Sequence, residues 1–313
     1  MSKVLEAVPN FSEGRDLDKV AQIVDRIGEH DVEVLDWSAD PDHHRSVVTF
    51  IGAPEDVVQA SVAAAECAFE LIDLRDHEGV HPRVGAVDVL PFVPLHHVEM
   101  AEAVACALSA AEAIARLGVP VYLYGRASRP PGRALATLRR GGFERLREGW
   151  PESRIPDFTA GRSEAHPSAG VCCVGARPVL LAWNVRVRGI SLERAKEIAA
   201  AVRERGGGFA GLRALGLYLE RQQCLQISMN LEDPDATSPL DVFAEIDRAV
   251  RASGGEIEGT EVIGMIPDTL VQPRSADTLK VLDLHVSRVL SHRVAQYLSR
   301  HPGPPTEIPD FTE

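Results

Sequence analysis

The chain has 313 residues, a net charge of −13 at pH 7 and five cysteines. Because one hydrophobic core rarely grows beyond about 250–300 residues, we expect two domains or subdomains. The acidic balance disfavours a nucleic-acid partner, which requires basic surface patches. An odd cysteine count, with Cys172-Cys173 as the only close pair, disfavours a disulfide framework. With neither a signal-peptide pattern nor an apolar run of about 18 residues, we expect a cytoplasmic protein that does not contact membranes.

The first half of the chain alternates strand and helix patterns. Short runs with alternating or Val-rich composition predict strands, and apolar residues at every third or fourth position predict helices. The expected order is βαββαβ: strand 3–8, helix 17–27, strands 31–37 and 46–52, helix 54–73 and strand 84–93. A helix over 98–117 and a strand over 119–125 follow, and residues 126–170 are predicted to form an irregular junction with one helix near 134–147.

The same order returns in the second half. We predict strand 178–188, helix 191–205, strands 212–219 and 224–230, helix 239–252 and strand 257–266. Two such units predict an α+β protein with two ferredoxin-like (βαββαβ) subdomains. We place these subdomains at residues 1–177 and 178–300, with a final helix over 281–298 and a loose tail at 301–313.

Residues 75–88, between a helix pattern and a strand pattern, carry two histidines, two arginines and several acids. Within them, His77-Glu78-Gly79-Val80-His81 matches the H-E-x-x-H zinc motif, which needs a continuous helix to bring both imidazoles to one metal. Gly79 and the following Pro82 disfavour that helix. We therefore expect no metal and keep a zinc hydrolase using His77 and His81 as an alternative; two exposed loop histidines are the plainer alternative. The adjacent His43-His44 is expected to decorate a polar turn.

Four segments resemble, in order and spacing, the signature segments of the formimidoyltransferase domain of glutamate formimidoyltransferase, which is also the N-terminal half of formimidoyltransferase-cyclodeaminase. They are residues 8–15, 81–88, 119–125 and 170–177, and the similarity covers roughly residues 1–300. The resemblance implies a folate cleft between the two halves. It also implies transfer of a formimidoyl group between N-formimidoyl-L-glutamate and tetrahydrofolate, giving 5-formimidoyltetrahydrofolate and L-glutamate in histidine degradation.

The resemblance also implies particular site residues. The catalytic histidine of the family lies in a His-Pro-Arg motif, which falls on His81. The folate-binding loop of the family lies between a Pro-Asp-Phe segment and a Gly-containing strand start. In this chain it corresponds to Thr159, Ala160, Gly161, Arg162, Ser163, Glu164, Ala165, His166, Pro167, Ser168, Ala169 and Gly170. Tetrahydrofolate is then a co-substrate, and no metal is implied.

The chemistry of the reaction agrees with a histidine at this position. A folate nitrogen attacks an amidine carbon, a tetrahedral intermediate forms, and the glutamate nitrogen leaves protonated. Histidine accepts and returns a proton near neutral pH, so we expect His81 to act as general base and acid. Substrate-binding candidates are Asn10, Ser12, Asp40, Arg45 and Arg83. The alternative for either arginine is a surface ion pair. Glu78, Asp76 or Asp40 could orient the imidazole, and the alternative for each of them is a solvated loop acid.

The amino-acid substrate is not fixed by these residues, because glycine could replace glutamate in the same reaction. A non-catalytic folate-binding homologue is a third functional class, which the intact His-Pro-Arg context disfavours. Because the chain ends without the helical cyclodeaminase half, we expect that another protein performs ring closure or that the product is used otherwise. We also expect a homodimer.

Overall fold

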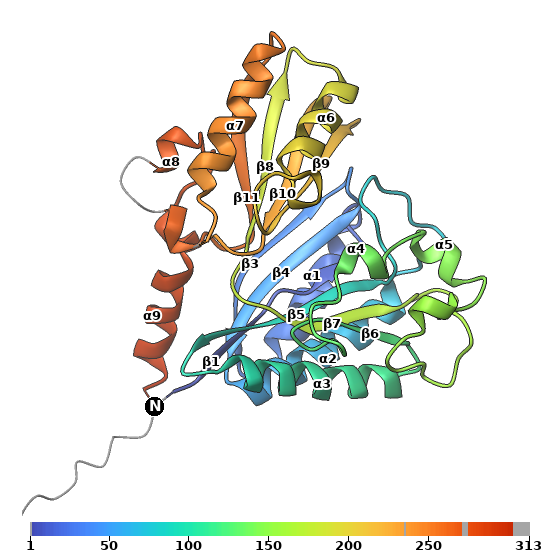
Figure 1. Ribbon diagram of the computed structural model, residues 1–313. Coiled ribbons are helices and arrows are strands. Elements are labelled where there is room, and N and C mark those ends of the chain that lie inside the picture. Colours follow the sequence, from blue (N-terminus) through green and yellow to red (C-terminus); the bar gives the residue numbers. More distant parts are fainter. Residues whose placement is uncertain (1, 235, 271–274, 303–313) are drawn as a thin grey trace, which may run out of the picture.

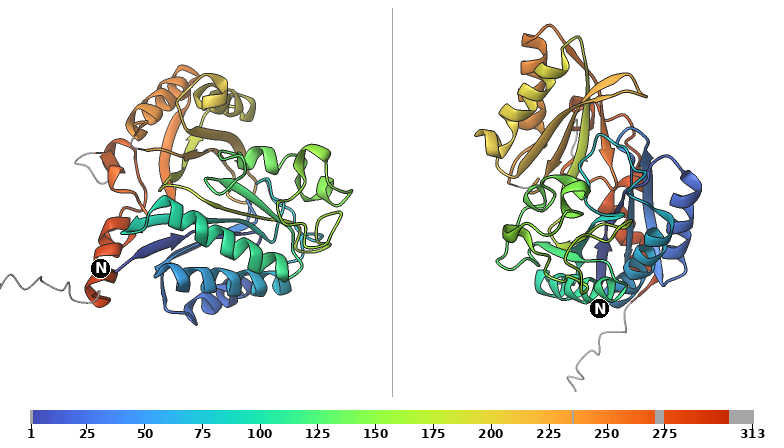
Figure 2. Two further views of the ribbon diagram at one scale, coloured as in Figure 1. Left: turned by 60° about the horizontal axis from the view of Figure 1, so that its bottom comes forward. Right: turned by 90° about the vertical axis from the view of Figure 1, so that its right-hand side faces the viewer.

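The computed structural model describes residues 2–234, 236–270 and 275–302. It contains two β-sheets, and the helices that cover each sheet lie on the outer side of the molecule (Figure 1). The two sheets turn their uncovered faces toward each other, as the rotated views of Figure 2 also show. The prediction of an α+β protein with two sheet bodies is confirmed. No helix in the described ranges is both long enough and apolar enough to cross a membrane.

The first sheet has seven strands. Its order is β3-β4-β1/β2-β5-β7-β6, in which β5–β7 and β6–β7 are parallel and the other pairs antiparallel. The βαββαβ order accounts for the part from β1 to β5, and β6 and β7 extend the sheet beyond it. The strands are β1 Val4–Ala7, β2 Asn10–Phe11, β3 Val32–Asp40, β4 Arg45–Gly52, β5 Val87–His96, β6 Val121–Gly125 and β7 Cys172–Ala176.

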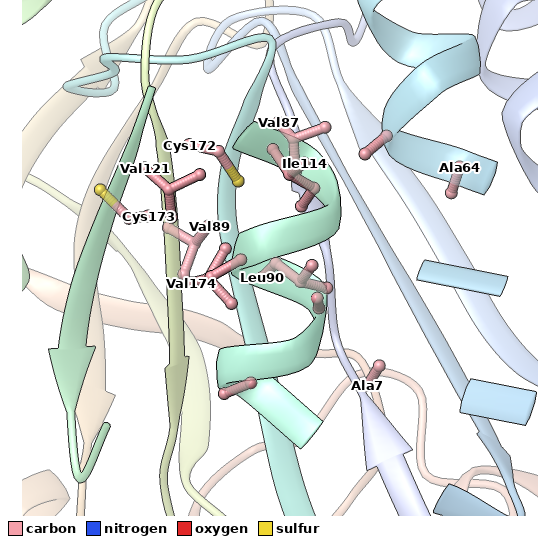
Figure 3. Close-up of a cluster of buried hydrophobic side chains, with 14 of the residues drawn as sticks. Ala7, Ala64, Val87, Val89, Leu90, Ile114, Val121, Cys172, Cys173 and Val174 are labelled. Atoms are coloured by element: carbon pink, nitrogen blue, oxygen red, sulfur yellow. The ribbon is translucent and has the colours of Figure 1, made fainter. Parts of the chain in front are cut away.

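Three helices cover one face of this sheet: α1 Leu17–Gly28, α2 Pro54–Leu71 and α3 Met100–Arg116. Asp16 caps α1 by accepting from the backbone N–H of Asp18 at 3.1 Å, which satisfies a donor that the first turn leaves free. Buried alanines on α2 and α3 let these helices approach closely. Figure 3 shows part of the resulting core, to which Leu90 of β5, Val174 of β7 and Ile114 of α3 belong.

The second sheet is wholly antiparallel, with the order β11-β8-β10-β9. This is the order of a ferredoxin-like unit, because the first strand lies between the third and the fourth. Two helices cover its outer face, and Ser191 caps the first of them by accepting from the N–H of Arg194 at 3.1 Å. The elements are β8 Leu181–Arg188, α6 Leu192–Val202, β9 Leu212–Leu219, β10 Cys224–Leu231, α7 Pro239–Ala252 and β11 Glu256–Ile263.

Two predicted helices were wrong in extent. The helix near 134–147 is two short helices, α4 Leu135–Leu138 and α5 Gly142–Leu146, because Gly141 and Gly142 have φ of 83° and 67° and interrupt it. The last helix, α9 Leu290–Arg300, begins nine residues later than the predicted 281–298. The remaining short elements are η1 Glu152–Arg154, η2 Glu204–Gly206, η3 Asp268–Leu270, α8 Ser275–Thr278 and η4 Val286–Arg288.

Residues 280–282 are not α-helical because they pair with β11, the edge strand of the second sheet. The N–H of Thr260 donates to Lys280 at 2.9 Å, and the N–H of Leu282 donates to Thr260 at 2.9 Å. α9 then packs against the first half near β1 and β3, where Tyr297 and Leu290 join a small buried cluster. From residue 303 onward, the expected tail lies outside the described residues.

Candidate active site

A cavity of about 580 Å³ lies between the uncovered faces of the two sheets. Strands β1 to β7 and the segment 131–139 line one side, and strands of the second half line the other. Of the residues predicted from the sequence, the cavity wall includes Asn10, Asp40, Arg45 and His81. Ser12, Arg83 and residues 159–170 are not part of that wall.

Residues 77–81 form an extended loop and not a helix, so the condition for the zinc-protease geometry is absent. Gly79 lies so close to the β3–β4 turn that a Cβ there would clash with the carbonyl oxygen of His43. The His77 Nε2–H donates to the carbonyl oxygen of His44 at 2.7 Å, and the two rings stack with centroids 4.2 Å apart. The loop is therefore fixed against the turn by close packing and by a buried histidine pair.

The expectation that His43 and His44 decorate a polar turn, and the alternative that His77 is an exposed loop residue, were wrong because all three side chains are buried. His43, His44 and His77 are each less than 9% exposed. Burial lowers the pKa of His77 to about 4; the hydrogen bond to the carbonyl oxygen of His44 opposes this, whereas the electrostatic effects of His44 and Arg83 add to it. His77 is thus neutral at physiological pH and contributes to packing.

The geometry of His81 defines its tautomer. Its Nδ1 lies 2.8 Å from the carbonyl oxygen of Pro82, which only accepts, so Nδ1 carries the proton and donates it. Nε2 makes no hydrogen bond to another described residue, and His81 lines the cavity. Burial within the protein, followed by the charges of Arg45 and Arg139, lowers the pKa of His81 well below its usual value, although Asp88 opposes this. His81 therefore presents a neutral, unprotonated nitrogen at the cavity.

Next to His81, the carboxylate of Asp88 is fully buried and binds two guanidinium groups. Its Oδ2 accepts from Arg45 Nη1 at 2.6 Å and from Arg139, and its Oδ1 accepts from the N–H of Val84 at 2.9 Å. Burial alone would raise the pKa of Asp88, but the two arginines hold it well below its ordinary range. Arg45 also donates to Asn10 Oδ1 at 3.0 and 2.8 Å. The cluster carries one net positive charge at the cavity wall.

Neither Asp88 nor Arg139 was predicted from the sequence to have a role of its own. Asp88 lies inside a Val-rich strand pattern, and an isolated acid in such a pattern was the only sequence feature that could have indicated a role. Arg139 lies in the segment predicted to be irregular. The buried Nε of Arg139 has no hydrogen-bond partner within the described structure. An unpartnered buried donor at a cavity wall is a position where a ligand can bind.

Arg83 and Ser12 have partners within the protein. Arg83 donates to both carboxylate oxygens of Glu144, at 2.8 and 3.2 Å, and to the carbonyl oxygen of His77 at 3.2 Å. This is the ion pair that the sequence left open as an alternative. Ser12 Oγ donates to the carbonyl oxygen of Gly85 at 2.7 Å. Both side chains therefore fix the chain on either side of the His81 loop.

The β9–β10 turn of the second half docks onto the β3–β4 turn of the first half. The carboxylate of Asp42 accepts from the backbone N–H groups of Arg221 at 2.9 Å and Gln222 at 3.3 Å. Asp40 accepts from the Gln222 side-chain amide at 3.0 Å and from the backbone N–H of Asp42 at 2.8 Å. Asp40 thus shapes the turn and joins the halves, in addition to lining the cavity.

A second contact between the halves reaches the catalytic candidate. His43 Nε2 lies 3.1 Å from Gln226 Oε1, a buried side chain on β10. The His43 ring in turn stacks on the His81 ring, with centroids 5.8 Å apart. The position of His81 thus depends on a residue of the second half, which no local sequence signal indicated.

Residues 159–170 lie beside the entry to β5. A Cβ on Gly170, whose φ is 71°, would clash with the carbonyl oxygen of Val84, so this glycine permits close backbone contact with the chain after His81. The guanidinium of Arg162 donates from Nε to the carbonyl oxygen of Gly118 at 3.1 Å. In the structure, this segment supports the loop that carries His81.

The cavity lining has more arginines than carboxylates although the chain is acidic overall. It includes six arginines and four carboxylates, whereas the whole chain has a net charge of −13. Four of these arginines are paired with carboxylates, and the net positive charge of the Arg45–Asp88–Arg139 cluster is the local feature that favours an anionic ligand. The arginines are Arg45, Arg126, Arg133, Arg139, Arg177 and Arg213, and the carboxylates are Glu6, Asp40, Glu232 and Asp233.

Comparison with known proteins gives consistent matches. A family model described as the formiminotransferase domain, N-terminal subdomain, matches residues 4–177, and a model described as the formiminotransferase domain matches residues 182–277. The glutamate formimidoyltransferase of Streptococcus pyogenes is 38% identical over 277 residues, covering 85% of this chain and 90% of that protein. The protein of the same name from Thermoplasma acidophilum is 40% identical over 272 residues, covering 85% and 88%.

A longer relative matches over the same region. The formimidoyltransferase-cyclodeaminase of Sus scrofa is 39% identical over 277 residues, covering 85% of this chain and 51% of that protein. The chain therefore spans about half the length of this relative.

Proposed function

Because the chain belongs to the formiminotransferase domain family, we propose that it transfers a formimidoyl group between N-formimidoyl-L-glutamate and tetrahydrofolate. In the direction of histidine degradation, N5 of tetrahydrofolate forms a bond to the amidine carbon. The tetrahedral intermediate then expels the glutamate nitrogen, and the products are 5-formimidoyltetrahydrofolate and L-glutamate. Tetrahydrofolate is a co-substrate in this proposal.

The observation that carries the mechanism is the free Nε2 of His81. With Nδ1–H donated to Pro82 and the pKa of the ring lowered, Nε2 is available to take the proton that the attacking nitrogen loses. The resulting imidazolium then returns this proton to the leaving glutamate nitrogen. Positioned acid–base groups of this kind contribute typically about 10²–10⁴-fold in rate.

The cluster of Arg45, Asp88 and Arg139 supplies the binding charge beside His81. Its net positive charge and the free Nε of Arg139 suit a carboxylate, which prefers guanidinium donors. Asn10 holds the Arg45 guanidinium in place. We propose that this cluster binds a carboxylate of the amino-acid substrate and thereby places its amidine carbon near His81.

Turnover of the purified protein tests the reaction directly. Tetrahydrofolate is combined with either N-formimidoyl-L-glutamate or N-formimidoylglycine, and formation of 5-formimidoyltetrahydrofolate is measured. We expect turnover with the glutamate compound. A preference for the glycine compound would change the assigned substrate, and the absence of product from both would refute the function.

Replacing His81 with Ala tests the mechanism. We expect kcat to fall by about 10²–10⁴-fold while the free energy of unfolding stays near the wild-type value, because His81 is a loop residue outside the hydrophobic cores. His97→Ala is the matched control, since His97 is exposed and lies away from the cavity. A His81→Ala variant with nearly full activity would end this mechanism.

The folate-binding role of residues 159–170 remains a prediction from the family resemblance. We propose that tetrahydrofolate protects this segment from hydrogen exchange and that Arg162→Ala weakens its binding by roughly 1–3 kcal/mol if a charged hydrogen bond to folate forms. Unchanged protection together with unchanged affinity would assign the whole folate site to the cavity wall. We also propose a cytoplasmic homodimer, and analytical ultracentrifugation checks the oligomeric state.

A further inference from the structure

Glu6 on β1 lies at the end of the cavity away from His81. In the sheet it is opposite Ile51 and Val93, whereas Asn10, which holds Arg45, is opposite Val47 and Val89. Four residues of extended chain separate Glu6 from Asn10, which corresponds to roughly 13 Å. The reacting carbon belongs near His81, so Glu6 is too distant to take part in the bond-making steps.

The carboxylate of Glu6 has no hydrogen-bond partner among the described residues, although only 4% of the residue is exposed. Buried carboxylates are costly unless they are paired. Burial raises the pKa of Glu6 to about 7, and the nearby charge of Arg177 opposes this only in part. The protein therefore keeps a strong, unsatisfied acceptor on the cavity wall.

Two hydroxyl groups on the same wall are also unpartnered. Thr49 Oγ1 of β4 and Tyr124 Oη of β6 are buried and make no hydrogen bond within the described structure. Arg177 is near enough to Tyr124 to affect its pKa but does not meet hydrogen-bonding geometry with it. Buried polar groups without partners are rare in folded proteins, and these two buried hydroxyls, on the same cavity wall as a carboxylate that makes no hydrogen bond to a described residue, indicate a polar ligand.

We infer that Glu6 binds the edge of the tetrahydropterin ring that carries the 2-amino group and the N3–H. This inference rests on the proposed function. These two adjacent N–H donors match the two oxygens of one carboxylate, as a guanidinium does. The other substrate, a formimidoylated amino acid, carries its N–H donors on the amidine, which must be near His81. A bicyclic ring with N5 toward His81 extends in the direction of Glu6, with the hydroxyls of Thr49 and Tyr124 available to its remaining polar atoms.

The test compares two ligands in three proteins. Dissociation constants at pH 8 are measured for tetrahydrofolate and for 2-desaminotetrahydrofolate with the wild type, Glu6→Gln and Glu66→Gln. Glu66 is an exposed acid on α2 and controls for the loss of a charge. We expect loss of the 2-amino group to weaken wild-type binding by roughly 10- to 100-fold, and Glu6→Gln to weaken tetrahydrofolate binding to a similar extent. The two ligands should then bind Glu6→Gln almost equally, and Glu66→Gln should behave as the wild type.

A measurement on the wild type alone keeps the inference testable if Glu6→Gln does not fold. The difference in affinity between the two ligands should widen as the pH rises through about 7, because only the ionised Glu6 accepts both N–H groups. Arg177 is the charged group beside Glu6. The opposing strand positions, Ile51 and Val93, are uncharged.

The outcomes separate this inference from the proposed function. The role of Glu6 would be overturned, with the proposed function intact, by one combination of results. In it the protein turns over tetrahydrofolate, but the affinity difference between the two ligands is the same in Glu6→Gln as in the wild type and does not change with pH. A wild-type protein that does not bind tetrahydrofolate would overturn both.

Discussion

Replacing Asp88 with Asn removes the charge that holds two arginines beside His81. The Asn side-chain oxygen still accepts from the N–H of Val84, but the cluster changes from one net positive charge to two. Asp88 has no exposed surface, so solvent does not screen this change. Removing one partner of a buried ion pair typically costs about 3–5 kcal/mol, and we expect the free energy of unfolding at pH 7 to fall by about that amount.

The same substitution changes how stability depends on pH. The folded-state pKa of Asp88 is held far below its ordinary value of 3.8. A carboxyl group with a lowered pKa adds stability above its unfolded pKa of about 4, and this contribution is lost as the pH falls through the folded-state value. The stability difference between the wild type and Asp88→Asn should therefore shrink as the pH falls below about 4.

Urea unfolding at pH 7 and pH 3, followed by circular dichroism, measures both effects. Asp88→Asn combined with Arg139→Met restores the original net charge, so this double variant should recover part of the lost stability at pH 7. Asp76→Asn, an exposed acid of the same loop, is the control and should change stability by less than about 0.5 kcal/mol. An Asp88→Asn variant within about 1 kcal/mol of the wild type, or a double variant no more stable than it, would refute the reasoning.

Three further predictions use other parts of the site. Burial holds the pKa of His77 near 4 in the folded protein, whereas this histidine protonates near pH 6.5 in the unfolded chain. The free energy of unfolding of the wild type should therefore fall by up to about 3 kcal/mol between pH 6.5 and 4. Urea titrations should show a smaller fall for His77→Gln, and an equal fall in both proteins would contradict this. Gln226→Leu removes the partner of His43 and should lower kcat more than it raises KM in steady-state assays, whereas unchanged kcat would exclude a positioning role. Because residues 77–81 are not helical, a chelator should leave turnover unchanged. One tightly bound zinc per chain, found by metal analysis, would instead favour the zinc hydrolase.

Local patterns predicted the order of helices and strands well, because each element buries one face and the spacing of its apolar residues follows from that burial. The predicted helix over 281–298 failed for a non-local reason. Its first part pairs with Thr260, so apolar positions that fit a helix are used by an extended segment. No periodicity within the segment distinguishes these two uses.

The candidate site shows the same limit. His81 was predicted through the family resemblance, and its loop conformation through Gly79 and Pro82. The burial of His43 could not be predicted, because a polar turn is normally exposed and its hydrogen-bond partner, Gln226, comes from the other half of the chain. The role of Asp88 could not be predicted either, because its partner Arg139 lies 51 residues away in the sequence.

The two faces of strand β1 have different roles, which matters for changing the substrate specificity of the enzyme. Leu5 and Ala7 belong to the core under the helices, whereas the alternate positions Glu6 and Val8 line the cavity. Substitutions at the second pair therefore change the cavity wall while leaving the helix-facing core in place. A one-residue insertion within β1 would instead exchange the two faces. Libraries for new acceptor or donor specificity should vary alternate positions of this strand and keep its length fixed.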